Sequence, residues 1–312
     1  MTENRIILHC GFIKSASTSL QYELVKSNKN FIGFDPSCKN DKFYSDDELA
    51  NFFEQVVRFA DCSIYNKSYK KIQKRLDQIL LQSENDMIIS NENLLGKIYP
   101  FDLPNRIKIQ RFTSVLPNNS VILIIIRDLK ELFYSWYKNL VSIGYSENYL
   151  YFINEIKIMD KYMSYFDSFN LQKIIHEIKN YRPDLKIEIC SIDDKKNFNK
   201  ILKRNRLPCI KSIKNKGLQF SNYQDSLELN KNKIRGLRFL DWIDIHRIFT
   251  NLKINENIKY QHSRLRRHHA KEIQKQHLIH SFSEDKLNFF NNLPKKIEKI
   301  SMINKVIYDK QV

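Results

Sequence analysis

The chain has 312 residues, of which 42% are hydrophobic and 12% aromatic, and this composition excludes a wholly disordered or fibrous protein. Its 52 basic and 35 acidic residues give a formal charge of +17, and residues 201–312 alone hold 24 basic and 10 acidic residues. Such a basic region is typical of a surface for an anionic partner, such as nucleic acid, an acidic glycan, a phosphorylated cofactor or a membrane face. A lysine-rich composition without any such partner explains it about equally well.

Five cysteines are present, an odd number, with no C-x-x-C pair and no histidine at metal-binding spacing. This usage is typical of free thiols in a reducing compartment. The apolar run near the N-terminus lacks the features of a signal peptide, and no apolar stretch approaches the roughly 20 residues that span a bilayer. We therefore expect a cytoplasmic protein without a transmembrane segment and without a metal site.

The first predicted strand covers residues 5–10 (RIILHC), a short apolar run that ends at Gly11. A helix is predicted over 18–26, where the apolar residues have helical spacing. The loop between them contains Lys14 and several small hydroxyl residues. Small side chains let backbone N–H groups approach an anion, and the helix N-terminus and the lysine add positive charge. The loop is therefore a candidate phosphate site, although an ordinary serine-rich helix cap has the same residue types.

Further strands are predicted at 87–90, 121–126 and 186–190, and the second of these (VILIII) is expected to be central because every residue is apolar. Helices are predicted at 46–58, 67–82, 147–180, 195–205 and 224–250. Strands that alternate with helices predict an α/β fold of three layers, with a mainly parallel central sheet flanked by helices. We expect a single domain over 1–312, with a basic and mostly helical C-terminal part from about 220 to 312.

Ligands of such folds bind beyond the carboxyl ends of the strands, where polar clusters are predicted at 11–19, 90–93 and 127–135. In the third cluster, Arg127 ends the central strand and Ser135 lies eight residues later, about two helical turns on. A guanidinium and a hydroxyl at this spacing can share an anion. Two anion sites at one edge of the sheet indicate a ligand with two separated phosphates.

Two of these segments resemble a known enzyme family. Residues 9–21 (HCGFIKSASTSLQ) resemble the 5′-phosphosulfate loop of sulfotransferases that use 3′-phosphoadenosine-5′-phosphosulfate (PAPS), which is usually H-x-G-x-x-K-T-G-T-T-x-L-Q in bacterial carbohydrate-type members. Residues 121–137 (VILIIIRDLKELFYSWY) resemble the 3′-phosphate element of this family, a hydrophobic strand with arginine and then serine eight residues later. Weaker similarity occurs at 90–92 and 214–217, so the resemblance covers about residues 5–220.

The resemblance implies a P-loop NTPase-like sulfotransferase fold and a transfer of the sulfuryl group from PAPS, the co-substrate, to a hydroxyl or amine of an acceptor. The acceptor would be a carbohydrate or polysaccharide, and no metal is implied. Lys14 would neutralise charge on the leaving phosphate. Arg127 with Ser135 would hold the 3′-phosphate, and Lys216 with Gly217 would close over it. The loop residues that would surround the 5′-phosphate are Gly11, Lys14, Ser15, Ala16, Ser17, Thr18 and Ser19.

The acceptor has to lose a proton, so a general base is expected beside the sulfuryl group. Glu92 is the preferred candidate, because it follows a predicted strand that ends at the same edge of the sheet. His9 is the second candidate, although its place in the first strand also suits a structural hydrogen bond. A third possibility, suggested by some carbohydrate members of the family, is the acidic group after the loop helix: Asp46, Asp47 and Glu48.

The loop departs from the family pattern at Ala16, where glycine is usual, and alanine is costly there if the backbone needs a positive φ. A P-loop kinase or NTPase is an alternative function, disfavoured because the loop lacks the G-x-x-x-x-G-K-[ST] spacing of a Walker A motif. A basic nucleic-acid-binding protein is another, but no recognisable reading motif is present. The basic run at 259–271 fits an acidic acceptor or a solvated helix face, and the solvated face is slightly favoured because the run is polar all round.

Overall fold

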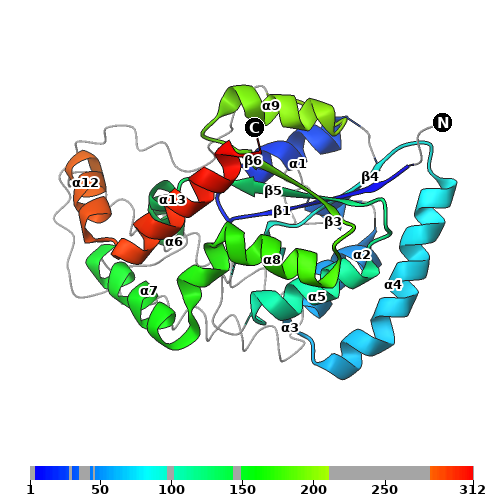
Figure 1. The fold of residues 1–312 in the computed structure, drawn as a ribbon, viewed down its shortest axis with the longest axis horizontal. Helices are drawn as coiled ribbons and strands as arrows, with labels where there is room; N and C mark the ends of the chain where they lie inside the picture. The colour runs from blue at the N-terminus through cyan, green and yellow to red at the C-terminus, as the bar shows by residue number, and fades with distance from the viewer. Residues whose placement is uncertain are drawn as a thin grey trace. The chain divides into compact units, whose positions relative to one another are not determined.

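The structure is a computed structural model that describes residues 4–27, 30–34, 43–44, 46–96, 102–142, 149–210 and 282–311. Within these residues the strands form one sheet of order β3-β2-β4-β1-β5-β6 (Figure 1). Its five strands other than β3 run parallel, and β3 pairs antiparallel with β2. The strand bounds are β1 (Ile6–Gly11), β2 (Phe31–Phe34), β3 (Phe43–Tyr44), β4 (Met87–Ser90), β5 (Val121–Ile126) and β6 (Lys186–Ser191).

Helices flank both faces of this sheet, because each parallel connection crosses over it. Figure 1 shows α1 (Ser17–Lys26) and α9 (Lys195–Arg204) on one face and α5 (Asn105–Val115) and α8 (Leu171–Tyr181) on the other. The predicted α/β class, with a mainly parallel sheet between helices, is confirmed. The other helical elements are α2 (Asp47–Asn51), a π-helix (Phe52–Val56), α3 (Val57–Phe59), α4 (Cys62–Gln82), a 3-10 helix (Glu92–Leu94), α6 (Leu129–Ser142), α7 (Tyr149–Met163), a second 3-10 helix (Tyr165–Phe169), α12 (Phe282–Asn292) and α13 (Lys295–Asp309).

The centre of the sheet is buried along its whole length, since every residue of β1, β4 and β5 is buried. In register, His9 of β1 lies between Ser90 of β4 and Leu123 of β5. At the carboxyl end of β1, a Cβ added to Gly11 would lie 2.4 Å from the carbonyl oxygen of Ile125. The backbone of β5 cannot move away to relieve this clash. Glycine is therefore required where β1 passes into the following loop.

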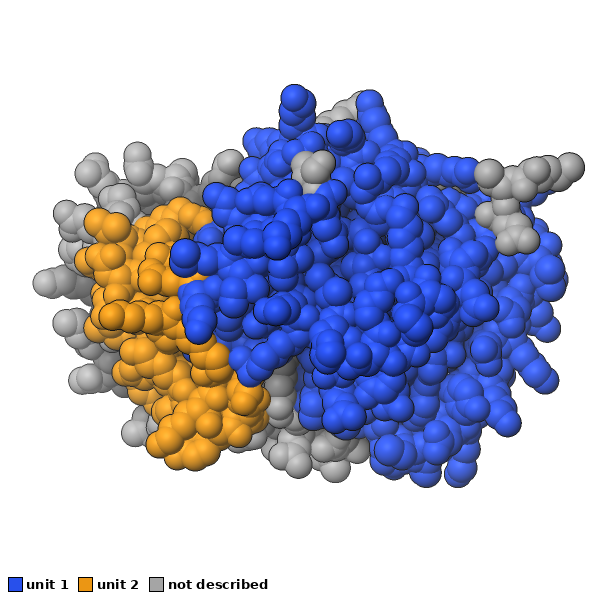
Figure 2. Space-filling view, in the orientation of Figure 1, with its two compact units in different colours: residues 1–129, 166–214, 299–312 blue, residues 130–165, 215–298 orange. Residues whose placement is uncertain are grey.

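The chain divides into two compact units, coloured separately in Figure 2. The first holds the sheet and comprises 1–129, 166–214 and 299–312, while the second comprises 130–165 and 215–298. Inside the first unit, Asn304 of α13 donates to the Phe169 carbonyl at 2.9 Å and accepts from the Leu171 amide at 2.9 Å. Inside the second, the Phe152 ring contacts Trp136 and Phe289 at centroid distances of 5.5 and 6.3 Å. Each unit thus has its own packed interior.

Most predicted elements are found, with two kinds of error. The strands predicted at 87–90, 121–126 and 186–190 are found, the last one residue longer, but β2, β3 and the helix α5 were not predicted. The helical stretch predicted over 147–180 is found but is interrupted: α7 ends at Met163, and Ser164 takes a left-handed φ of 48° before the 3-10 helix and α8. The helix predicted at 224–250 lies outside the described residues.

None of the described helices is both long enough and apolar enough to cross a membrane. The four cysteines of the described part, Cys10, Cys62, Cys190 and Cys209, are free thiols. Burial in β1 and β6 raises the pKa of the Cys10 and Cys190 thiols, so both are held in the neutral form.

Candidate functional site

The loop from β1 to α1 has an unusual backbone. Lys14 and Ala16 both adopt left-handed conformations, with φ values of 61° and 62°. Ala16 occupies the N-cap position of α1 and offers no side-chain cap, while its carbonyl accepts from the amides of Ser19 at 2.9 Å and Leu20 at 3.2 Å. A helix start without a side-chain cap leaves its first N–H groups directed at whatever lies beyond it. The backbone of this loop can therefore bind an anion.

Two serine hydroxyls of the loop are buried: the Ser15 hydroxyl makes no hydrogen bond to any described residue, and the Ser17 hydroxyl lies beside the Glu92 carboxyl group. Ser15 is fully buried, and Ser17 is 1% exposed. Buried hydroxyls normally have a partner, because desolvation without one costs free energy. Thr18 is exposed and Ser19 is buried. The Ser15 hydroxyl thus provides unused hydrogen-bonding capacity beside the helix N-terminus, at a position where the sequence predicted a contact to a phosphate.

Arg127 follows the last residue of β5 and reaches back to the same loop. Its Nη1 donates to the Lys14 carbonyl oxygen at 3.3 Å, and its positive charge lowers the pKa of the Lys14 ammonium. The structure therefore brings Arg127 to Lys14, although 113 residues separate them in the sequence. Ser135, the predicted partner of Arg127, is half-buried on α6 and belongs to the second unit. That Ser135 and Arg127 bind the same anion stays a prediction.

Glu92 is a half-buried residue in the 3-10 turn that follows β4, and it lies near Ser17 and Lys14 of the loop region. Burial raises the pKa of Glu92, while the nearby Ser17 hydroxyl and Lys14 ammonium oppose this rise and Glu54 reinforces it. Burial also lowers the pKa of Lys14, against the opposing charge of Glu92. Lys14, Ser17 and Glu92 are thus neighbours at the carboxyl ends of β1 and β4, as the parallel pairing of these strands requires.

His9 is fully buried in the middle of the sheet. Its Nδ1 is hydrogen-bonded to the Ser90 hydroxyl at 2.7 Å, and that hydroxyl also accepts from the Gln21 amide at 3.2 Å. Burial lowers the pKa of His9 to about 3, so the ring is neutral. The Nε2 atom makes no hydrogen bond to a described residue. These contacts tie β1, β4 and α1 together behind the loop, and a catalytic role for His9 stays a prediction.

Two residues of the acidic group after the loop helix, Asp46 and Glu48, have structural partners. Asp46 caps α2 by accepting from the Leu49 amide at 3.0 Å, and the exposed Glu48 pairs with Lys71 at 2.6 Å. The carboxylate of this region that does influence the pKa of Glu92 is Glu54, which the sequence did not single out. Glu54 lies in a π-helical turn, an irregularity that is often found at functional sites.

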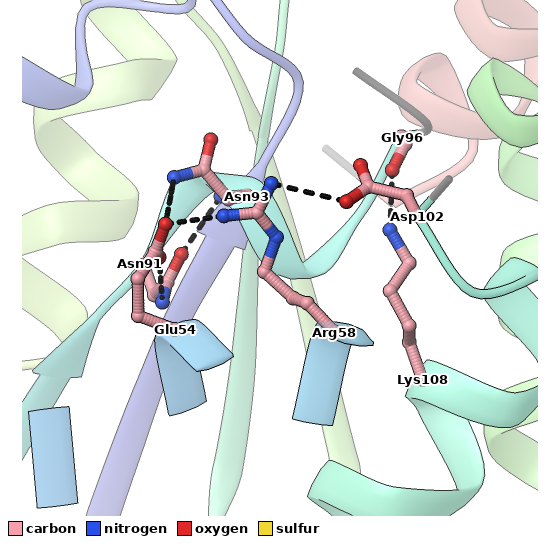
Figure 3. A network of polar contacts seen from close by, with 7 residues as sticks. All are labelled: Glu54, Arg58, Asn91, Asn93, Gly96, Asp102 and Lys108. Atoms are coloured by element: carbon pink, nitrogen blue, oxygen red, sulfur yellow. Dashed lines mark hydrogen bonds and ion pairs between the residues drawn. The ribbon is translucent and has the colours of Figure 1, made fainter. Parts of the chain in front are cut away.

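Glu54 connects the two residues that flank Glu92, Asn91 and Asn93, to Arg58 of α3 (Figure 3). Its carboxylate accepts from the Asn91 side chain at 2.8 Å and from the Asn93 side chain at 3.1 and 3.2 Å. It also pairs with Arg58, which in turn binds Asp102 at 3.1 Å. No local pattern predicts this cluster, because the contacts join a π-helical turn and a strand end that lie 37 to 39 residues apart.

Lys216 and Gly217, predicted to close over the cofactor, lie outside the described residues, as does the basic run at 259–271. Among the residues that the structure does describe, no group of three or more His, Cys, Asp or Glu side chains is arranged to hold a metal ion. No protein-family model, curated protein or solved structure matches the chain. A function therefore has to be argued from the residues at the edge of the sheet.

Proposed function

We propose that this chain is a PAPS-dependent sulfotransferase with a P-loop NTPase-like sulfotransferase fold. It would transfer the sulfuryl group of PAPS to a hydroxyl or amine, most simply on a carbohydrate, and release 3′,5′-adenosine bisphosphate. The proposal extends the sequence resemblance at 9–21 and 121–137 to the whole reaction.

The observation that carries the proposal is the meeting of Lys14, Ser17, Arg127 and Glu92 at one edge of the sheet. Two positive charges and an uncapped helix N-terminus favour a phosphorylated ligand. A single carboxyl group with a raised pKa lies next to them. Anion binding together with one general base is what a transfer between a phosphosulfate and a neutral acceptor needs.

In the proposed reaction, an acceptor oxygen or nitrogen forms a bond to sulfur while the bond between sulfur and the bridging phosphate oxygen breaks. The acceptor proton passes to the Glu92 carboxylate, and the electron pair of the broken bond stays on the 5′-phosphate. Lys14 stabilises that charge, and the loop amides with the Ser17 hydroxyl hold the phosphate in line. A raised pKa suits Glu92 to this step, because a base works best when its pKa approaches the working pH.

Isothermal titration calorimetry with 3′,5′-adenosine bisphosphate, ATP and a duplex oligonucleotide tests the proposal against its two alternatives. We expect the bisphosphate to bind more tightly than ATP, and we expect the oligonucleotide not to displace the bisphosphate. Binding of ATP without binding of the bisphosphate would favour a kinase or NTPase. Binding of the duplex alone would favour a nucleic-acid-binding protein, and either result would overturn the proposal.

Lys14→Ala provides the matching variant. We expect it to lower sulfuryl transfer by about 100-fold, the typical cost of removing a group that stabilises transition-state charge. Lys26→Ala is the control, because Lys26 is exposed in the last turn of α1, at the opposite end of this helix from the loop, and lies over the Tyr22 ring at 4.6 Å. If Lys14→Ala transfers sulfate as well as Lys26→Ala does, the assignment of the loop is wrong.

A further inference from the structure

The two residues on either side of Glu92 share one binding partner. Asn91 and Asn93 both direct their side-chain Nδ2 atoms to the Glu54 carboxylate, at 2.8 Å and at 3.1 and 3.2 Å (Figure 3). Asn91 also fixes the turn from inside, because its Oδ1 accepts from the Asn93 amide at 2.9 Å and its own amide donates to the His9 carbonyl at 2.9 Å. The peptide that carries Glu92 is thus bound on both flanks to Glu54.

Glu54 itself is held firmly from the other side. Arg58, one helical turn later, pairs with the same carboxylate, and Arg58 is only 2% exposed. The second Nη atom of Arg58 binds Asp102, whose side chain is fully buried, at 3.1 Å. A charge-assisted network whose members are all paired holds its groups in fixed positions. Glu54 is therefore a fixed anchor.

We propose that Glu54 is a positioning residue for Glu92: by binding Asn91 and Asn93 and being held by Arg58, it fixes the turn that aims the Glu92 carboxyl group at the Lys14 loop. This inference rests on the proposed function, because Glu92 is the expected base of that reaction. Glu54 does not act on the acceptor, since both of its oxygens are occupied by Asn91, Asn93 and Arg58.

The charge of Glu54 also acts on Glu92. The groups that face Glu92 are Lys14 of the loop and Ser17 of α1, which lower its pKa, and Glu54 of the π-helix, which raises it. Removal of the Glu54 charge should therefore lower the pKa of Glu92. In the pH dependence of kcat/KM, the acid limb reports the base that must lose its proton, so this limb should move to lower pH.

Glu54→Gln tests the inference, with Glu54→Asp as the conservative rescue and Glu84→Gln, at an exposed carboxylate, as the control. In this variant the amide NH₂ group of glutamine replaces a carboxylate oxygen that accepts hydrogen bonds from Asn91, Asn93 and Arg58. We expect kcat to fall by about 10- to 100-fold, since small misplacements of a reacting group cost rates of this order, while KM for PAPS stays within about twofold. The acid limb should shift down in Glu54→Gln and stay in place in Glu54→Asp. An unchanged kcat with an unmoved limb would overturn the inference.

A second variant and a second measurement cover the remaining outcomes. If Glu54→Gln does not fold, Asn93→Ala removes one flank of the turn, and wild-type kcat in that variant would count against the inference. Carboxyl NMR on ¹³C-glutamate protein, with the Glu92 signal assigned by its loss in Glu92→Gln, measures the pKa of Glu92 without any transfer assay. If the proposed function is wrong, the wild-type protein binds no bisphosphate. If only the positioning role of Glu54 is wrong, Glu54→Gln leaves the pKa of Glu92 unchanged.

Discussion

Lys14 and Glu92, at the ends of neighbouring strands, each shift the pKa of the other toward its charged form, while burial drives both toward the neutral form. Burial is the larger effect for both groups. A partly buried pair of this kind gains from a bound anion, because a phosphate beside Lys14 would stabilise the ammonium form. Burial, with the nearby charge of Glu54, gives Glu92 the raised pKa that a base needs.

Replacement of Glu92 by glutamine should separate chemistry from binding. In Glu92→Gln we expect sulfuryl transfer to be abolished, because glutamine cannot take the acceptor proton, and bisphosphate affinity to stay within about twofold, since the loop backbone is unchanged. Single-turnover rates and calorimetry measure the two quantities. Loss of both together would instead mark Glu92 as a structural residue of the loop.

The raised pKa of Glu92 also predicts how stability depends on pH. The native state holds the Glu92 proton more tightly than the unfolded chain, whose pKa is near 4.5. As pH rises from about 4.5 through the native pKa, the wild type should therefore lose stability relative to Glu92→Gln. Urea titrations at several pH values from 4 to 8 measure this difference, with exposed Glu84→Gln as the control. A difference that grows in the opposite direction would contradict the burial of Glu92.

The sequence indicates those parts of the fold that depend on local patterns. Six apolar residues in succession predict β5, and a short apolar run that ends at Gly11 predicts β1 and its loop. Parallel pairing then brings Lys14, Glu92 and Arg127 to one edge without further information. The start of α4 was predicted five residues too late, although Asp61 carries a recognisable cap that accepts from the Ser63 and Ile64 amides.

Other features have no local signal. The break between α7 and α8 occurs at Ser164, which adopts a left-handed φ of 48° without the glycine that usually marks such a position. Strand β2 has only four residues and owes its place to pairing with β4, which is distant in sequence. Glu54 meets Asn91 and Asn93 only through tertiary packing. Residues 211–281 carry much of the positive charge, and the predictions for Lys216 and Gly217 remain predictions.

The buried Ser17 hydroxyl predicts a loss of binding with little change in stability. Its neighbour among the described residues is the Glu92 carboxyl group, whose pKa it lowers, so Ser17→Ala should change the free energy of unfolding by at most about 1 kcal/mol. Bisphosphate affinity should fall about tenfold, equivalent to about 1.4 kcal/mol, as one ligand hydrogen bond is lost. Ser120→Ala is the matched control. Ser120 is likewise only 1% exposed, and its hydroxyl has no hydrogen-bond partner among the described residues. It precedes β5, at the opposite end of that strand from Arg127, so it is far from the loop. Equal affinities in the two variants would contradict a ligand contact at Ser17.

Ala16 predicts a gain in stability on substitution by glycine. Its φ of 62° is unfavourable for a residue with a Cβ, so Ala16→Gly should raise the free energy of unfolding by about 1 kcal/mol. The same change in a regular helix should do the opposite, and Ala50→Gly in α2 should cost about 1 kcal/mol. Urea denaturation of both variants measures the pair. A loss of stability in Ala16→Gly would show that the loop does not hold this conformation in solution.

Arg58 predicts the largest loss of stability. It is 2% exposed and lies between the carboxylates of Glu54 and Asp102, so Arg58→Met would leave two acidic groups without their shared cation. Breaking a buried ion pair in this way costs about 3 to 5 kcal/mol, because the remaining charge is both desolvated and unpaired. Arg75→Met removes an arginine that is 47% exposed and 3.4 Å from Asp46, which should cost at most about 1 kcal/mol. Denaturant midpoints for the two variants compare these values directly. Equal midpoints would show that Glu54 is not held by Arg58, and the fixed anchor inferred for the Glu92 turn would be lost with it.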